Sequence, residues 1–408
     1  MTTTYPLRVI TADQVDAWAR MVTTTYGQDW IEGGLRNAAV SLDPGRTLAA
    51  FDGGDIVGGA SVYGRVMTVP GATVPVAGIT LVAVLPTHRR RGILTAMMRE
   101  QLTGLYESGG EPVAALNAAE ATIYGRFGYG VASQVAEIRG DKRFMALRPG
   151  ADLGDGTIRL LGRQEALPLL EKTYDVARRG GAGWVDRTER FWRARLADGE
   201  RVREGGGTAL RFAVHTEPGG EVSGYVLYRS RQKVVRVVEL VSTTRQAYAA
   251  LWRFLIDLDA HTGLSYDGAV DEPLKHLLAD PRAAHTTVVD NLWVRLVDVP
   301  RALAVRRYSA PLDVVVEVRD AFCPWNAGRY RLRAGGEAVT CERTRAAADL
   351  RLTSAELGAA YLGGTTLSSL AAAGRVEELR PGAVAATSAA FRGEREPFHP
   401  SGAAFPAF

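Results

Sequence analysis

Apolar and polar residues alternate along the first part of the chain as they do in half-buried β-strands. Alternation over residues 48–51 and 56–63 brackets the turn Asp52-Gly53-Gly54-Asp55, which predicts a β-hairpin. Further strands are expected at residues 73–76, 78–85 and 113–117. Residues 91–106 carry apolar side chains at helical spacing, which predicts a helix with one apolar face. These elements indicate an α/β domain with a central, largely antiparallel sheet, in which one strand leads directly into a helix.

The middle of the chain repeats this pattern in a degraded form. Residues 213–228 (AVHTEPGGEVSGYVLY) resemble residues 50–63 (AFDGGDIVGGASVY), and residues 239–252 take the place of the strand-to-helix junction. If Arg245 is aligned with Arg89, Tyr248 falls where Gly92 stands. We therefore expect the second copy to keep the fold and to lose the loop.

Two stretches of linker composition, residues 148–156 and 298–312, divide the chain into three segments. The expected domains are residues 1–148, 149–298 and 299–408. A chain of 408 residues is too long for one ordinary core, which agrees with this division. The last segment predicts several strands followed by helices near residues 354–361 and 367–373, and it contains no recognisable catalytic motif.

Composition excludes several classes of function. The formal charge of +4 comes from 49 basic and 45 acidic residues, so nucleic acid is not the expected partner. No signal peptide and no apolar stretch of membrane-spanning length is recognised. The two cysteines suggest neither a disulfide framework nor a metal site, and we expect a cytoplasmic protein without a metal.

The most informative stretch is V-A-V-L-P-T-H-R-R-R-G-I-L-T, at residues 82–95. A strand ends near Leu85 and a helix begins near Gly92, so unpaired backbone N–H groups and the helix dipole converge on one place. Gly92 allows a phosphate to approach closely, and the adjacent arginines add charge. This arrangement suits a pyrophosphate. The alternative is a basic helix start that is simply solvated.

A second motif, E-A-T-I-Y-G-R-F-G-Y-G at residues 120–130, follows one helix and one strand later. Together the two motifs resemble the GCN5-related N-acetyltransferase (GNAT) superfamily, whose R/Q-x-x-G-x-G/A signature corresponds to Arg89-Arg90-Arg91-Gly92-Ile93-Leu94. Leu94 departs from that signature. The combination is similar to the narrower Enhanced intracellular survival (Eis) family of actinobacteria, and this similarity extends over the whole chain.

The resemblance implies tandem GNAT-like domains with central mixed sheets, an active first copy and a degenerate second one, followed by a sterol-carrier-protein-like α+β domain. It also implies an N-acetyltransferase that uses acetyl-CoA and acts on amines of the aminoglycoside, polyamine or lysine type, and a hexameric assembly. The residues implied to contact the cofactor are Val82, Ala83, Val84, Arg89, Arg90, Arg91, Gly92, Ile93, Leu94, Thr95 and Ala119.

The resemblance also suggests catalytic groups. Acetyl transfer requires a general acid for the departing sulfur, and a tyrosine is protonated at neutral pH because its usual pKa is about 10. By resemblance this acid is Tyr124, with Tyr129 as the alternative. The implied base or positioning group is the α-carboxylate of Phe408, whose apolar tail favours a docked chain end over a frayed one.

For the acceptor, acidic and aromatic residues in a helical N-terminal stretch are candidates: Tyr26, Gln28, Asp29 and Trp30. A competing hypothesis is a non-catalytic ligand-binding or lipid-binding scaffold with a vestigial acyltransferase core.

Overall fold

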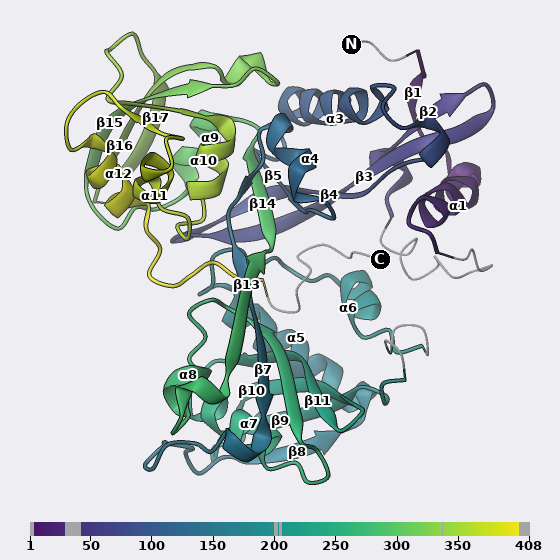
Figure 1. Ribbon diagram of the computed structural model, residues 1–408, viewed down its shortest axis with the longest axis vertical. Helices are drawn as coiled ribbons and strands as arrows, with labels where there is room; N and C mark the ends of the chain where they lie inside the picture. Colours follow the sequence, from purple (N-terminus) through teal and green to yellow (C-terminus); the bar gives the residue numbers. More distant parts are fainter. Residues whose placement is uncertain (1–3, 29–41, 200–202, 204–205, 337, 400–408) are drawn as a thin grey trace.

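The computed structural model describes residues 4–28, 42–199, 203, 206–336 and 338–399. Within these residues the chain forms three mixed sheets, each covered by helices (Figure 1). The expected fold class, two GNAT-like α/β units followed by an α+β unit, is confirmed.

The first sheet has seven strands and contains the predicted hairpin. Its order is β1 (Leu7–Val9), β2 (Thr47–Asp52), β3 (Asp55–Val69), β4 (Ala72–Val84), β5 (Val113–Asn117), β14 (Leu292–Leu296) and β6 (Gly130–Val131). Its helices are α1 (Val15–Thr25), α3 (Ile93–Ser108) and α4 (Ala121–Tyr124). The apolar face of α3 packs on the sheet, as its periodicity predicts, through buried residues that include Met97, Met98 and Leu102.

The two strands expected at residues 73–76 and 78–85 are one continuous strand, β4. Pro75 and Gly78 do not interrupt it, because β4 pairs with the long strand β3 from Ala72 to Val84. Pairing to a neighbour along its whole length therefore overrides the local signals that suggested a break.

The second sheet also has seven strands. Its order is β13 (His285–Asp290), β7 (Gln134–Asp141), β12 (Gly263–Gly268), β11 (Val234–Ser242), β10 (Val222–Arg231), β9 (Arg211–Thr216) and β8 (Thr157–Leu161). Helices α7 (Arg245–Ile256) and α8 (Leu274–Leu277) contribute to one hydrophobic core, and α5 (Arg163–Arg178) and α6 (Glu189–Arg195) contribute to another.

The first two sheets exchange strands across the boundary expected at residues 148–149. Strand β7 leaves the first segment to pair with β12 and β13, and β14 returns from the second segment to lie between β5 and β6. The crossing chains are joined where Asn291 N donates to Ser133 O and Ala132 N donates to Leu292 O. In Figure 1, β13 lies in the second unit and β14 continues from it into the first.

The third sheet has five strands, in the order β17 (Ala338–Arg343), β16 (Gly328–Gly335), β15 (Leu312–Arg319), β18 (Leu350–Thr353) and β19 (Glu377–Glu378). Helix α9 (Val299–Val305) connects it to β14 of the first sheet, and its own helices are α10 (Ser354–Ala360), α11 (Leu367–Ala372) and α12 (Ala383–Phe391). One buried cluster contains residues of β3, β4, β14 and this third unit, so the first and third units share a core. Among the described residues, no helix is long and apolar enough to cross a membrane.

Candidate active site

The candidate site begins where β4 and β5 separate. They are parallel neighbours only at residues 76–78, where they pair with residues 113–115. Within β4, Leu81 has a positive φ of 56°, and the register with β3 shifts at this point. A bulge of this kind bends a strand and increases its twist. As a result, the C-terminal part of β4, from residue 79 to residue 84, has backbone groups that are not paired with β5.

The loop after β4 leads these open backbone groups to the start of α3. Arg90 and Gly92 both have positive φ, 62° and 80°, and Gly92 is the N-cap of α3 without a side-chain cap. Residues alternating between left- and right-handed conformations make backbone N–H concavities that bind anions. A Cβ on Gly92 would meet no atom within 4 Å, so the space in front of the loop is open. The loop therefore fits a phosphate group, and the 16-residue helix behind it adds a favourable dipole.

Side chains of the loop tie it to the first strands. His88 Nε2 lies 3.2 Å from Asp52 Oδ2, at the turn between β2 and β3. The His88 ring also meets Tyr5 edge-on, and the Tyr5 hydroxyl accepts a 2.5 Å hydrogen bond from Arg91 Nη1. Arg89 and Arg90 are exposed. The loop is therefore held in place while its positive charges remain accessible.

The other residues expected to contact the cofactor surround the same gap. Ala83 and Ile93 are buried in the core, while Val82, Val84, Leu94 and Thr95 are half-buried and Ala119 is exposed just after β5. Leu94, which departs from the GNAT signature, packs against the core cluster below α3. Its side chain is therefore accommodated without closing the loop.

Tyr124 is the last residue of α4, which follows β5. It is 8% exposed, and burial raises the pKa of its hydroxyl above the usual value, with Tyr26 and Glu120 acting in the same direction. Tyr129 meets the Tyr124 ring edge-on at 6.1 Å and is fully buried. Its hydroxyl has no hydrogen-bond partner among the described residues, and burial raises its pKa as well. Both tyrosines are therefore protonated at neutral pH.

Of the expected acceptor residues, Tyr26 lies at the site. It follows α1 directly, and its hydroxyl donates a 3.1 Å hydrogen bond to the carbonyl of Val82. Gln28 is exposed, and Asp29 and Trp30 lie outside the described residues. The N-terminal helix is thus joined to β4 at the open gap.

In the second unit the corresponding junction is shorter. Strand β11 ends at Ser242, and α7 begins at Arg245 with Thr244 as its N-cap. Tyr248 is inside this helix, and its hydroxyl donates to Glu272. The loop that carries Gly92 in the first unit has no counterpart here.

The described chain end packs against the second unit. Arg395 Nε lies 2.5 Å from Asp271 Oδ2, and the N–H of Glu396 donates to the same oxygen at 3.2 Å. Phe398 is buried against Val135 and Ala269. His399 is buried as well, and desolvation by burial holds the pKa of its imidazole well below the usual value. Phe408 lies outside the described residues.

Two features of the site carry no signal in the sequence. Leu81 has a left-handed conformation that leucine rarely adopts, so nothing marks the bulge in advance. Arg295, which contacts the segment between Tyr124 and Tyr129, lies about 170 residues away and enters the first sheet only because β14 crosses over. A third residue, Tyr5, accepts the hydrogen bond from Arg91, and in the sequence it is marked only as an aromatic residue near a strand.

Family models match all three units. Residues 6–132 and residues 183–296 each match an acetyltransferase (GNAT) domain, and residues 299–400 match a sterol carrier protein domain. The first match contains the loop at Gly92 and Tyr124. GNAT domains imply acetyl-CoA as the co-substrate.

Relatives resemble the chain over most of its length. An uncharacterized N-acetyltransferase of Streptomyces avermitilis is 41% identical over 98% of this chain and 100% of its own length. The N-acetyltransferase Eis of Mycobacterium tuberculosis is 40% identical over 80% of this chain and 81% of its own. The crystal structure of Eis1 from Mycobacterium abscessus superimposes with a TM-score of 0.84 at 35% identity, covering 97% of this chain and 99% of that one. The chain therefore belongs to the Eis family of GNAT N-acetyltransferases.

Proposed function

We propose that the first unit transfers the acetyl group of acetyl-CoA to a primary amine of the aminoglycoside, polyamine or lysine type. The observation that carries this proposal is the juxtaposition of the gap between β4 and β5 with the open N-terminus of α3 and with Tyr124. The second unit lacks the loop, so we assign the transfer to the first unit alone.

The residues at the gap suit coenzyme A. The backbone of Val82, Ala83 and Val84 would pair with the amide groups of the pantetheine arm, as an added strand pairs with a sheet edge. The residues at positions 89–95 would hold the pyrophosphate, and Ala119 would border the arm from the side of β5. When bound, acetyl-CoA supplies a thioester that an amine can attack.

The reaction forms an amide bond and breaks a C–S bond, so the amine loses a proton and the departing sulfur gains one. In this proposal Tyr124 donates the proton to sulfur. Its raised pKa keeps the hydroxyl protonated through the neutral range. Tyr129 is the alternative donor, although it is more deeply buried.

We propose the α-carboxylate of Phe408 as the base or as the group that positions the ammonium form of the acceptor. Support comes from the described chain end, where Arg395 and Phe398 are held by the second unit and His399 is buried. The last nine residues, 400–408, can span at most about 30 Å when extended. We propose that the terminus reaches the site of the first unit within this span.

For the acceptor we propose a wall that includes Tyr26, with Gln28 and the adjoining Asp29 and Trp30 as further candidates. An acidic and aromatic wall would favour a cationic amine. The family resemblance also implies a homohexamer, and light scattering would test this by measuring the molar mass of the protein in solution. The family assignment favours the enzyme over a non-catalytic scaffold.

An acetylation screen tests the proposal. Spermidine, a lysine-containing peptide and an aminoglycoside would be mixed with acetyl-CoA while free thiol is followed, and the products weighed by mass spectrometry. We expect amine-dependent thiol release with a mass gain of one acetyl group on the amine. Thiol release without an acetylated amine, or no turnover with any amine class, would contradict the proposal.

A further inference from the structure

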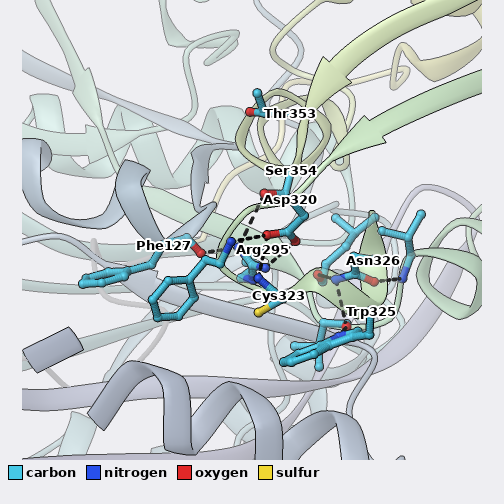
Figure 2. Close-up of polar contacts among 12 residues, drawn as sticks. Phe127, Arg295, Asp320, Cys323, Trp325, Asn326, Thr353 and Ser354 are labelled. Atoms are coloured by element: carbon cyan, nitrogen blue, oxygen red, sulfur yellow. Dashed lines mark hydrogen bonds and ion pairs between the residues drawn. The ribbon is translucent and has the colours of Figure 1, made fainter. Parts of the chain in front are cut away.

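A buried ion pair connects the third unit to the first at the segment that carries Tyr124. Arg295 on β14 and Asp320, just after β15, have side chains that are 0% and 1% exposed. Their closest atoms, Nη2 and Oδ2, are 2.5 Å apart. Figure 2 shows the Arg295 guanidinium between this carboxylate and the backbone of Phe127.

Both members of the pair are held by further hydrogen bonds. The second oxygen of Asp320 accepts from the N–H of Phe322 at 3.2 Å and of Cys323 at 2.8 Å. Arg295 Nη1 donates to the carbonyl of Phe127 and lies 3.5 Å from Ser354 Oγ at the start of α10. The guanidinium therefore has a fixed orientation set by the third unit.

The contacted segment is the turn between Tyr124 and Tyr129. Gly128 has a φ of 81°, and a Cβ at this position would overlap Arg295 Nη1 and Ser354 Oγ. The Phe127 ring also meets Phe322 of the third unit, with ring centroids 5.0 Å apart. Since the N–H of Tyr129 donates to Tyr124 O at 3.3 Å, a displacement of Phe127 would be transmitted to Tyr124.

Stability alone does not account for such a pair. Removing two charges from water costs free energy, and apolar residues of similar volume often give an equally stable protein. A planar guanidinium with two directed hydrogen bonds does, however, specify the relative positions of the groups that it joins.

We propose that Arg295, oriented by Asp320, is a positioning residue that fixes the turn at Phe127 and thereby aims the Tyr124 hydroxyl at the reacting sulfur. This inference rests on the proposed role of Tyr124. The inference gives the sterol-carrier-protein-like unit a part in acetyl transfer, because Asp320 and Phe322 of this unit hold the turn next to Tyr124.

Two variants test the proposal with steady-state kinetics on the full chain. Arg295→Lys keeps the charge and loses the planar fork, while Arg295→Met with Asp320→Leu removes both charges and avoids leaving one unpaired. We expect kcat per folded molecule to fall about 10- to 100-fold, the usual cost of a small misplacement at an active site. The Kd for acetyl-CoA should be unchanged, because the hydrogen-bond partners of Arg295 lie outside the loop at Gly92. The folded fraction is measured by circular dichroism.

Arg306→Met is the matched control. Arg306 is also 0% exposed, and it donates to carbonyls of Tyr361 at 2.5 Å and Phe391 at 2.7 Å without touching the turn. We expect this variant to lose stability while keeping kcat per folded molecule. If the Arg295 variants behave in the same way, the pair is structural and the proposal is wrong.

A double variant separates this proposal from the proposed chemistry. If Arg295 acts through Tyr124, Arg295→Lys should lower kcat little further in a Tyr124→Phe background. Independent, multiplying effects would overturn the positioning role. If Tyr124→Phe alone has no effect, the assigned acid is wrong, and that result can be recognised whatever the Arg295 variants do.

Discussion

At the scale of single residues, the site depends on backbone conformation as much as on side chains. Gly92 and the arginines before it could be read from the sequence because a glycine after a basic run at a strand-to-helix junction is a specific signal. Tyr124 could be named only through the family resemblance. The bulge at Leu81 could not be predicted, since a left-handed conformation is expected at glycine, asparagine or aspartate and not at leucine.

Replacing Tyr124 by phenylalanine removes the proposed acid and keeps the ring. We expect kcat to fall about 10²-fold, the lower range for loss of a general acid, with the acetyl-CoA Kd unchanged. Because burial raises its pKa above 10, ionisation of Tyr124 should not lower the activity at any pH up to 9. Stopped-flow kinetics that isolate the chemical step would check both. Near-normal chemistry in Tyr124→Phe together with a large loss in Tyr129→Phe would transfer the role to Tyr129.

Gly92→Glu places a carboxylate where we expect the pyrophosphate. The added Cβ meets no atom, but a side chain at a φ of 80° strains the backbone locally, so the folded fraction is measured by circular dichroism. Repulsion between anions should abolish acetyl-CoA binding measured by calorimetry. Gly150→Glu is the matched control, because Gly150 also has a positive φ, 76°, and no atom within 4 Å of its Cβ. Equal cofactor affinity in the two variants would show that the loop does not bind the phosphates.

At the scale of elements, several strands and helices followed from periodicity, and the pairing between units did not. The hairpin at residues 52–55, helix α3 and strand β5 lie where alternation and helical spacing predict them. The exchange of β7 and β14 could not be derived, because neither the mixed pattern of β7 nor the five apolar-rich residues of β14 indicates which sheet the strand joins. The replacement of Gly92 by Tyr248 did, however, indicate the shortened junction before α7.

The buried contact at α7 predicts a pH-dependent stability. Burial raises the pKa of Glu272 from 4.5 to about 7, although Tyr248 donates a hydrogen bond to it. Stabilisation from the raised pKa is complete below about pH 4.5 and is lost as the pH rises through 7. The glutamine in Glu272→Gln cannot ionise. The Tm of this variant, measured relative to the Tm of the parent protein, should therefore rise between pH 5 and pH 8. The exposed Glu221→Gln should show no such gain in differential scanning fluorimetry, and equal curves for all three proteins would refute the assignment.

At the scale of the whole molecule, the three units meet around the chain end. The first and third share a core, and the second holds residues 395–399 through Asp271 and through the N–H of Phe398, which donates to Ala182 O at 2.9 Å. The sequence suggested a docked tail from its apolar composition, but not the partners that hold its beginning. Those partners are single polar groups on loops after α5 and β12, which leave no periodic pattern.

If the chain end brings the Phe408 carboxylate to the first unit, weakening the contact between Arg395 and Asp271 should lower the activity less than removing the carboxylate does. Deleting Phe408 should lower kcat/KM about 10²-fold, as expected for loss of a proton-transfer group. Asp271→Asn should lower it only about two- to fivefold, since an exposed ion pair contributes at most about 1 kcal/mol. Asp313→Asn, which breaks the comparably exposed pair with Arg331, serves as the control and should have no effect. Full activity without Phe408 would exclude the carboxylate from the reaction.

We expect one coenzyme A site per chain, in the first unit. The most direct test is a crystal structure of the protein with coenzyme A. The predicted electron density lies in the gap between β4 and β5, with the pyrophosphate against the N–H groups around Gly92 and the sulfur within hydrogen-bonding distance of the Tyr124 hydroxyl. Density in the second unit, or a sulfur that Tyr124 cannot reach, would contradict it.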